Sequence, residues 1–362
     1  MPRSSELAAW LRLTLTPGIG GEAQRKLLAA FGLPDKIFDA GPAALAGAIP
    51  LKQAEQLLTH DSENEIAAAL AWAAGPGNAI LTLADAAYPR KLLDTPDPPT
   101  ILYARGRTDL LNAPAFAIVG SRNATPQGES NAQAFAAALS NAGLAIISGL
   151  ALGIDAAAHR GGMREQGSTI AVIGTGIDRI YPARNQDLAR EIAAQGVIIS
   201  EFPLGTPALK ENFPRRNRLI SGLAQGCLVV EAAERSGSLI TARLAGEQGR
   251  DVFAIPGSIH SPLSKGCHKL IKQGAKLVDD ARDILEELGY GVTSPGKPAA
   301  TPRQSTDETR LLDCLGYDSC DVDTLAMRSG LTAERLYAIL LQMELDGKIA
   351  SLPGGRFQRI GP

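Results

Sequence analysis

The chain is poor in aromatic residues and carries almost no net charge. Phe, Trp and Tyr make up 4% of its 362 residues, and the formal net charge is −2. This balance excludes a protein that coats polyanions with its whole surface, so any nucleic-acid site must be local. Because aromatic rings are scarce, a ring that stands among basic residues gains weight as a sign of function.

The sequence also lacks the patterns of membrane-spanning, secreted and metal-binding proteins. It has no uninterrupted run of eighteen apolar residues, and Met1-Pro2-Arg3 leads into a mixed amphipathic stretch rather than a signal peptide. The four cysteines form no C-x-x-C pair and match no paired histidine spacing. We therefore expect a cytoplasmic protein with reduced thiols, no membrane span, no metal site and no cofactor.

The length and composition predict a globular protein of two or three domains, with 45% hydrophobic and 20% charged residues. Residues 1–75 show helical patterns and no β-rich run, which predicts a helical domain of the SAM/helix-hairpin-helix-like kind. Within it, residues 17–21 (Pro-Gly-Ile-Gly-Gly) fit either an amide site for a DNA phosphate or a tight turn that needs glycine torsions. We favour the turn.

Residues 78–290 alternate short apolar runs with helical stretches. Such a pattern predicts a parallel sheet covered on both faces, that is, an extended Rossmann-like doubly wound α/β domain. The apolar runs expected to form strands are 116–119, 145–147, 169–173, 197–199, 227–230 and 252–255.

The last part of the chain divides into a linker and a small domain. Residues 291–306 are rich in proline, glycine and hydroxyl residues, as in flexible linkers. Residues 307–362 read as three helices and a hairpin with a Pro-Gly-Gly turn, which predicts a winged-helix domain. Its third helix, 332–346, holds three acidic residues and one arginine, a balance that repels phosphate. We therefore expect it to contact protein.

One nine-residue segment, 210–218, combines the features of a strand-binding site. Guanidinium and ammonium groups bind phosphate, and a neighbouring ring offers a face on which a base can stack. A helix start with ordinary surface arginines explains the segment equally well. The segment contains four cations (Lys210, Arg215, Arg216 and Arg218), one acid (Glu211), one ring (Phe213) and one amide (Asn217).

Small polar loops follow three of the predicted strands, at 120–128, 148–155 and 174–182. In an open parallel sheet these loops meet at the carboxyl edge, where ligands bind. Glycine amides at helix starts bind anions, and Arg122 adds a guanidinium fork, so the loops predict phosphate binding. They contain neither G-x-G-x-x-G nor a P-loop, which argues against an ATPase or GTPase.

No convincing catalytic group is present. Asp155 and His159, four residues apart on one helix, fit a helix cap and a packing residue. Glu201 and Glu231 end strands and could act as bases, but we expect them to accept hydrogen bonds from arginine or serine, because no nucleophile or metal accompanies them. The prediction is a protein without catalytic residues, not an enzyme.

Together these residues resemble the DNA processing protein A family (DprA, also called Smf), bacterial recombination mediators. The resemblance covers about residues 85–280 and implies sequence-independent binding of single-stranded DNA, homodimerisation through the Rossmann-like domain, and loading of RecA recombinase during natural transformation and recombination. Single-stranded DNA-binding protein is a further implied partner. The runs that carry it are 120–122, 148–155, 158–159, 169–182, 199–205, 213–223, 229–231, 236–242 and 254–257.

The resemblance also implies which residues contact DNA. Arg122 and Lys210 would neutralise phosphates, while Phe213 would support a base. The full set carried over by position is Gly120, Ser121, Arg122, Gly149, Lys210, Phe213, Arg215, Arg216, Asn217 and Arg218.

Two other functions remain open. A nucleotide phosphoribohydrolase of the lysine-decarboxylase-like group would share the glycine loops and would use Glu231 as its acid–base residue. Against it stands the segment 213–218, which a small-ligand site does not need. A scaffold protein would use the same loops for packing and would bind neither strand nor nucleotide.

Overall fold

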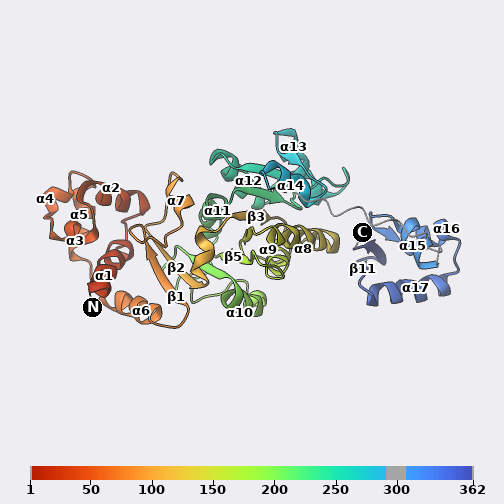
Figure 1. The fold of residues 1–362 in the computed structure, drawn as a ribbon, viewed down its shortest axis with the longest axis horizontal. Helices are drawn as coiled ribbons and strands as arrows, with labels where there is room; N and C mark the ends of the chain where they lie inside the picture. Colours follow the sequence, from red (N-terminus) through yellow and green to blue (C-terminus); the bar gives the residue numbers. More distant parts are fainter. Residues whose placement is uncertain (1, 291–306, 361–362) are drawn as a thin grey trace.

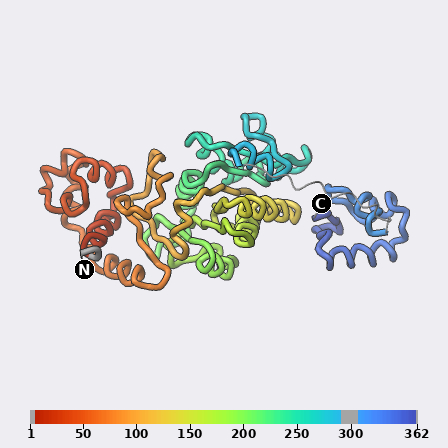
Figure 2. The backbone as a smooth tube through the Cα atoms, in the orientation of Figure 1, coloured from red at the N-terminus to blue at the C-terminus, as the bar shows by residue number. Residues whose placement is uncertain are grey.

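The computed structural model describes residues 2–290 and 307–360, so the predicted linker lies outside the described residues. An N-terminal group of helices leads into a nine-stranded, mostly parallel sheet, and a small unit with a three-stranded sheet ends the chain (Figures 1 and 2). This confirms the predicted α/β class with N-terminal helices and a winged helix. None of the helices in the described ranges is both long and apolar enough to cross a membrane.

The N-terminal helices enclose a small core of their own, which includes Leu13, Leu27 and Leu57. Between the first two helices, Gly18 takes a φ of +78°, a conformation that residues with a Cβ rarely adopt. The glycines there thus form a tight interhelical turn. The helices are α1 (Pro2–Leu15), α2 (Gly21–Phe31), α3 (Pro34–Asp39), α4 (Pro42–Leu45), α5 (Leu51–Thr59) and α6 (Glu63–Ala73).

The central sheet has the strand order β1-β2-β6-β5-β4-β3-β7-β8-β9. Strands β3 to β9 run parallel to one another, whereas β2 runs antiparallel to both of its neighbours, β1 and β6. The six predicted apolar runs form β3 to β8; β1, β2 and β9 were not predicted. The strands are β1 (Asn78–Thr82), β2 (Ile101–Gly106), β3 (Ala115–Val119), β4 (Ala145–Ser148), β5 (Thr169–Val172), β6 (Val197–Ser200), β7 (Gly226–Val229), β8 (Asp251–Ala254) and β9 (Lys276–Leu277).

Helices cover both faces of this sheet (Figure 1). Successive side chains of a strand point to opposite faces. In β3, Phe116 and Ile118 pack with α8, α9 and α14, whereas Ala117 and Val119 pack with α7, α11, α12 and α13. The helices are α7 (Arg90–Leu93), α8 (Pro126–Asn141), α9 (Ile154–Gly162), α10 (Gln186–Gln195), α11 (Asn212–Leu223), α12 (Ser238–Glu247), α13 (Lys265–Lys272) and α14 (Ala281–Glu287).

The N-terminal helices pack directly on the antiparallel edge of the sheet. Trp10 of α1 lies in one buried cluster with Tyr103 of β2, and Trp72 of α6 meets the Tyr103 ring edge-on at 5.8 Å between centroids. An ion pair of 2.5 Å joins Arg25 of α2 to Asp97, just before β2. Apolar packing and this ion pair therefore fix the helices to the α/β domain.

The C-terminal unit has its own apolar core, which includes Leu311, Leu325 and Leu340. Its hairpin turns at Gly354 and Gly355, whose φ values of +85° and +68° explain the Pro-Gly-Gly sequence. The strand order is β10-β12-β11. The elements are α15 (Asp307–Leu315), β10 (Cys320–Asp321), α16 (Val322–Ser329), α17 (Ala333–Leu345), β11 (Ile349–Leu352) and β12 (Arg356–Arg359).

Candidate nucleic-acid interface

A cavity of about 720 Å³ opens at the carboxyl ends of β3, β4 and β7. We call it the loop cavity. Its walls are the loop after β3 (120–123), the start of α9, the first turns of α11, and the loop before α12 with the first residue of that helix (235–238). Ligands bind at such edges of doubly wound sheets, because glycine loops and helix starts converge there.

An aromatic pair forms one wall of the loop cavity. The rings of Phe213 and Tyr181 lie 5.6 Å apart between centroids, with their planes tilted by 44°. The Arg122 guanidinium carbon lies 5.5 Å from the Phe213 centroid. A cation at this distance is attracted to the ring face. The cavity thus combines flat apolar surface with a positive charge.

The glycine loop after β5 packs against this aromatic wall. A Cβ built on Gly174 would lie 3.0 Å from Cδ1 of Phe213. Gly174 therefore makes room for the ring. Packing against Phe213 accounts for this glycine, whereas the sequence had suggested an anion-binding amide.

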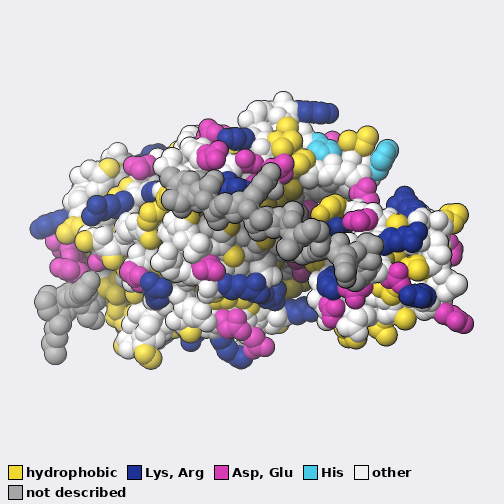
Figure 3. All heavy atoms as spheres, turned by 45° about the vertical axis from the view of Figure 1, so that its right-hand side comes forward, with side chains coloured by type: hydrophobic (Ala, Val, Ile, Leu, Met, Phe, Trp, Pro, Cys, Tyr) yellow, Lys and Arg dark blue, Asp and Glu magenta, His cyan; other side chains and the backbone are white. Residues whose placement is uncertain are grey.

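Basic side chains surround the cavity. Arg122, Lys210 and Arg235 are exposed on its walls, and Arg216 lies buried beneath it. Asp155 is the acidic residue among the lining residues, so the cavity carries a local excess of positive charge. Elsewhere the charge is mixed: on the face drawn in Figure 3, acidic and basic side chains are interspersed.

The loop after β3 is shaped by its first two residues. A Cβ on Gly120 would come within 2.6 Å of Ile154 Cγ1, so this glycine permits close packing against α9. The Ser121 hydroxyl accepts a hydrogen bond from the Asn123 amide at 3.1 Å. Both contacts hold Arg122 at the cavity rim.

Gly149 and Arg216 form a buried support under the cavity. The Gly149 amide donates to Asp155 at 3.1 Å, and the Arg216 guanidinium donates to the carbonyls of Gly149, at 2.7 Å, and Val172. Burial raises the pKa of the Asp155 carboxyl, and the charge of Arg216 opposes that rise. The Gly149 amide and Nη1 of Arg216 are thus engaged with the protein, and both residues also line a small pocket with Arg122, Tyr181 and Phe213, so their contact with DNA stays a prediction.

His159 and Asp155 fix the loop after β4, as the sequence suggested. The Leu150 amide donates to His159 Nε2 at 3.3 Å, and His159 Nδ1 lies 2.7 Å from the Thr169 hydroxyl. Burial lowers the pKa of His159 to about 3, with smaller contributions from Arg216 and a neighbouring arginine. His159 is therefore a neutral packing residue.

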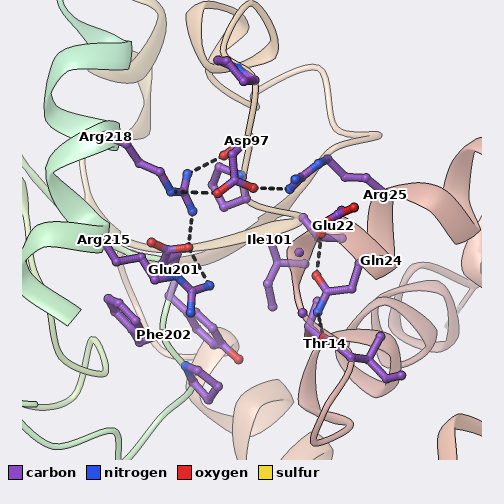
Figure 4. A pocket seen from close by; sticks show the side chains of 18 residues that line it. Thr14, Glu22, Gln24, Arg25, Asp97, Ile101, Glu201, Phe202, Arg215 and Arg218 are labelled. Carbon is purple, nitrogen blue, oxygen red and sulfur yellow. Dashed lines mark hydrogen bonds and ion pairs between the residues drawn. The ribbon is translucent and has the colours of Figure 1, made fainter. Parts of the chain in front are cut away.

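Arg215 and Arg218 lie on the other side of α11, in a second cavity of about 620 Å³ between α2 and α11 (Figure 4). Both pair with the buried carboxylate of Glu201, at 3.1 Å and 2.5 Å. Arg218 also contacts Asp97, at 3.2 Å. The structure therefore does not bring these two arginines together with the loop cavity.

Asn217, by contrast, lies in the loop cavity. Its side-chain amide is 3.4 Å from the carbonyl of Gly237, so it joins α11 to the loop before α12. Of the ten residues expected to contact DNA, seven line the loop cavity: Gly120, Ser121, Arg122, Lys210, Phe213, Arg216 and Asn217.

Glu231 supports the loop after β3. Its two carboxylate oxygens accept hydrogen bonds from the Thr125 amide, at 2.9 Å, and the Thr125 hydroxyl, at 2.6 Å. Thr125 in turn caps α8 by accepting from the Gly128 amide at 3.0 Å. These contacts agree with the structural role that the sequence favoured for this glutamate. Within the described ranges, no three His, Cys, Asp or Glu residues lie close enough to hold a metal ion.

Sequence reasoning missed two groups of cavity residues. Tyr181 lies 48% exposed beside Phe213. Arg235, Ser236 and Ser238 form the wall opposite α11. Both groups follow strands, so their position at the carboxyl edge was a usable signal.

The fold and site together define a doubly wound α/β protein with a basic, aromatic cavity at the carboxyl edge of its sheet and a winged helix at its end. Residues 79–289 match the family model of DNA recombination-mediator protein A, and residues 295–355 match that of the DprA winged helix domain. The chain belongs to the DNA recombination-mediator protein A family.

Similar proteins of known sequence come from several bacteria. Protein Smf of Escherichia coli strain K12 is 42% identical over 315 residues, which cover 85% of this chain and 84% of that protein. DNA processing protein DprA of Streptococcus pneumoniae is 48% identical over 209 residues, which cover 58% of this chain and 74% of that protein.

Two solved structures are similar as well. The X-ray structure of DprA from Streptococcus pneumoniae matches with a TM-score of 0.69 and 38% identity, over 77% of this chain and 97% of that one. DNA processing protein A from Helicobacter pylori, whose single-stranded DNA binding mode has been described, matches with a TM-score of 0.53 and 32% identity, over 58% of this chain and 95% of that one.

Proposed function

We propose that this protein binds single-stranded DNA without sequence preference in the loop cavity and delivers RecA recombinase onto the bound strand. The observation that carries the first part is the arrangement of Phe213, Tyr181 and Arg122 in one cavity. The single-stranded DNA binding mode described for the Helicobacter pylori relative supports it.

Each feature of the cavity has a role in this proposal. Arg122, Lys210 and Arg235 attract the phosphates of the strand, which provides affinity that depends on salt but not on sequence. Phe213 and Tyr181 stack on bases, and every base has a face to offer. Bases in a duplex are already stacked and paired, so the cavity favours a single strand.

The carboxylates near the cavity support a binding protein rather than a hydrolase. Glu231 is held by two hydrogen bonds from Thr125 and does not line the loop cavity. Asp155 is held by the amides of Gly149 and Ala151. An acid–base residue must reach the reacting atoms, and neither group is free to do so.

The test is fluorescence anisotropy of a labelled oligo-dT strand at two salt concentrations, with AMP and a matching duplex as competitors. We expect binding that weakens with salt, resists AMP and is poorly competed by duplex. Binding of AMP with no affinity for the strand, and release of free base that Glu231→Gln abolishes, would replace this proposal by the phosphoribohydrolase.

RecA delivery is the second part of the proposal, and it rests on membership of a family of recombination mediators. We place this activity in the cytoplasm, with a homodimer formed through the α/β domain and with single-stranded DNA-binding protein as a competitor on the strand. The measurement is the rate at which RecA filaments form on a strand coated with that protein. The chain should raise this rate, and Phe213→Ala should reduce the gain; an unchanged rate with the parent chain would contradict the second part alone.

A further inference from the structure

The outward side of α17 is apolar. One side of this helix is buried in the core of the winged-helix unit. A helix that packs on a core with one side normally carries charged or polar residues on the side that faces water. Here the outward side carries three large apolar residues at intervals of four, which form a single row along the helix: Tyr337, 55% exposed, Leu341, 60% exposed, and Leu345, 74% exposed. We call them the α17 stripe.

The charges around the stripe do not suit DNA. In winged helices that read DNA, the corresponding helix lies in the major groove beside phosphates. Here Glu334 precedes the stripe, and Glu344 and Asp346 lie at its end. Arg335, the single cation of α17, is paired with Asp307 at 2.5 Å. Phosphates would be repelled, so the stripe is suited to a protein surface.

The residues of the stripe are spaced symmetrically about Leu341. Tyr337 stands four residues before Leu341, and Leu345 stands four residues after it. A two-fold axis at Leu341 would therefore place Tyr337 of each chain against Leu345 of the other. The Leu341 side chains of the two chains would touch at the centre. Such self-complementarity is the property of an isologous interface.

The charges at the two ends also complement each other in this arrangement. Glu334 and Arg335 stand at the start of the helix, and Asp346 and Lys348 follow its end. Antiparallel pairing brings Glu334 of one copy near Lys348 of the other, at both ends of the stripe. Within its own chain Lys348 also contacts Glu308 at 2.9 Å and Asp346 at 3.3 Å, and 42% of its side chain stays exposed to the second copy. Antiparallel helix dipoles also attract.

We propose that α17 pairs antiparallel with α17 of a second copy of this chain, so that the winged-helix units join two molecules. The pairing goes beyond binding of the strand and uses none of the residues of the loop cavity. It would remove the apolar side chains of the stripe from water, which is the driving force for the contact.

Oxidative cross-linking of the full chain tests this pairing. In Leu341→Cys the two thiols would face each other at the axis, so mild oxidation should give a covalent dimer. Gln342→Cys is the matched control, since it lies one residue along and about 100° around the helix. Of the natural cysteines, Cys227, Cys267 and Cys320 are buried and Cys314 is partly exposed, so both cysteine variants are made with Cys314→Ser.

Sedimentation of Leu341→Glu is the second arm. Leu341 is exposed, so the substitution should leave the thermal midpoint unchanged while lowering the average mass of the assembly at micromolar concentration. Equal cross-linking of the two cysteine variants, or none in either, together with an unchanged mass for Leu341→Glu, would overturn the proposal. Cross-linking at position 341 to RecA alone would also overturn it, because the occupant would then be another protein.

Discussion

Arg122 holds its guanidinium carbon 5.5 Å from the centre of the Phe213 ring. This contact joins the loop after β3 to the first turn of α11 and leaves a ring and a cation on one surface. A nucleotide offers a base that can stack and a phosphate that a cation can neutralise, so the pair is a suitable unit for binding a strand.

Replacing Phe213 by alanine should weaken binding of an oligo-dT strand by about 1–3 kcal/mol, which is the usual contribution of one stacked base. Phe213→Tyr keeps the ring and should bind like the parent chain. Anisotropy titrations of the three proteins measure the difference. Equal affinity of the alanine variant and the parent would show that no base stacks on this ring.

Removing a cation from the loop cavity should change the salt dependence of binding. In Arg122→Ala or Lys210→Ala, the slope of log affinity against log salt should fall by about 0.7, the loss of one contact to a single strand. Arg215→Ala is the matched control, because Arg215 is paired with Glu201 in the cavity on the other side of α11. If Arg215→Ala reduced the slope and Arg122→Ala did not, the strand would lie on the other side of the helix.

Tyr181 should act as a second stacking position. Tyr181→Ala should weaken strand binding by about 1–3 kcal/mol, and Tyr181→Phe should not, because stacking needs the ring and not the hydroxyl. The same titrations test this with strands of increasing length. Loss of affinity in both variants would instead assign a hydrogen-bonding role to the hydroxyl.

Gly149→Ala should destabilise the fold by about 1–3 kcal/mol, as overpacking usually does. The added Cβ would lie 2.3 Å from Nη1 of Arg216, which is buried and held by two carbonyls. Gly246→Ala on the exposed side of α12 meets no atom within 4 Å and should stabilise by up to about 1 kcal/mol. Urea unfolding compares the stability of the two variants. An unchanged midpoint for Gly149→Ala would show that the Arg216 side chain can move to make room for the added Cβ.

Stability should fall in acid partly because of His159. Its pKa is lowered to about 3 in the folded chain from 6.5, so between these values the unfolded chain binds a proton that the folded chain does not. Stability from this residue is therefore complete above about pH 6.5 and is lost as the pH falls. Between about pH 7 and pH 5 the loss should be on the order of 2 kcal/mol.

Urea unfolding of the parent and of His159→Gln at several pH values measures this contribution. Gln has no proton to gain, so its stability should depend less on pH over this range. The two curves would run parallel if His159 were charged in the folded chain.

Much of the fold was readable from the sequence, because β3 to β8 are continuous apolar runs and the winged helix has clear helical and turn patterns. One of the unpredicted strands has a physical reason. β9 has two residues, both exposed, and so lacks an apolar run. β1 and β2 do contain apolar runs, at 79–83 and 101–104, which were not predicted to be strands; one face of these strands packs on the N-terminal helices and the other on the main core of the sheet.

The site was readable in part. The cluster of charges at 210–218 located α11, but counting charges along the chain ignored its helical period. That period places Phe213 and Asn217 toward one cavity and Arg215 and Arg218 toward another. The hydrogen bond of the Gly149 amide could not be predicted from the sequence, because it is the turn into α9 that brings its acceptor, the Asp155 carboxylate, close to it.

The most direct measurement is photocross-linking of an oligonucleotide that carries bromodeoxyuridine, followed by mass spectrometry of the linked peptides. Stacked bases link to the rings they touch, so the links should fall on Phe213 and Tyr181, and an excess of unlabelled oligo-dT should suppress them. Links confined to residues 17–21 or to the winged-helix unit, with none at the loop cavity, would contradict the assignment of strand binding to this edge of the sheet.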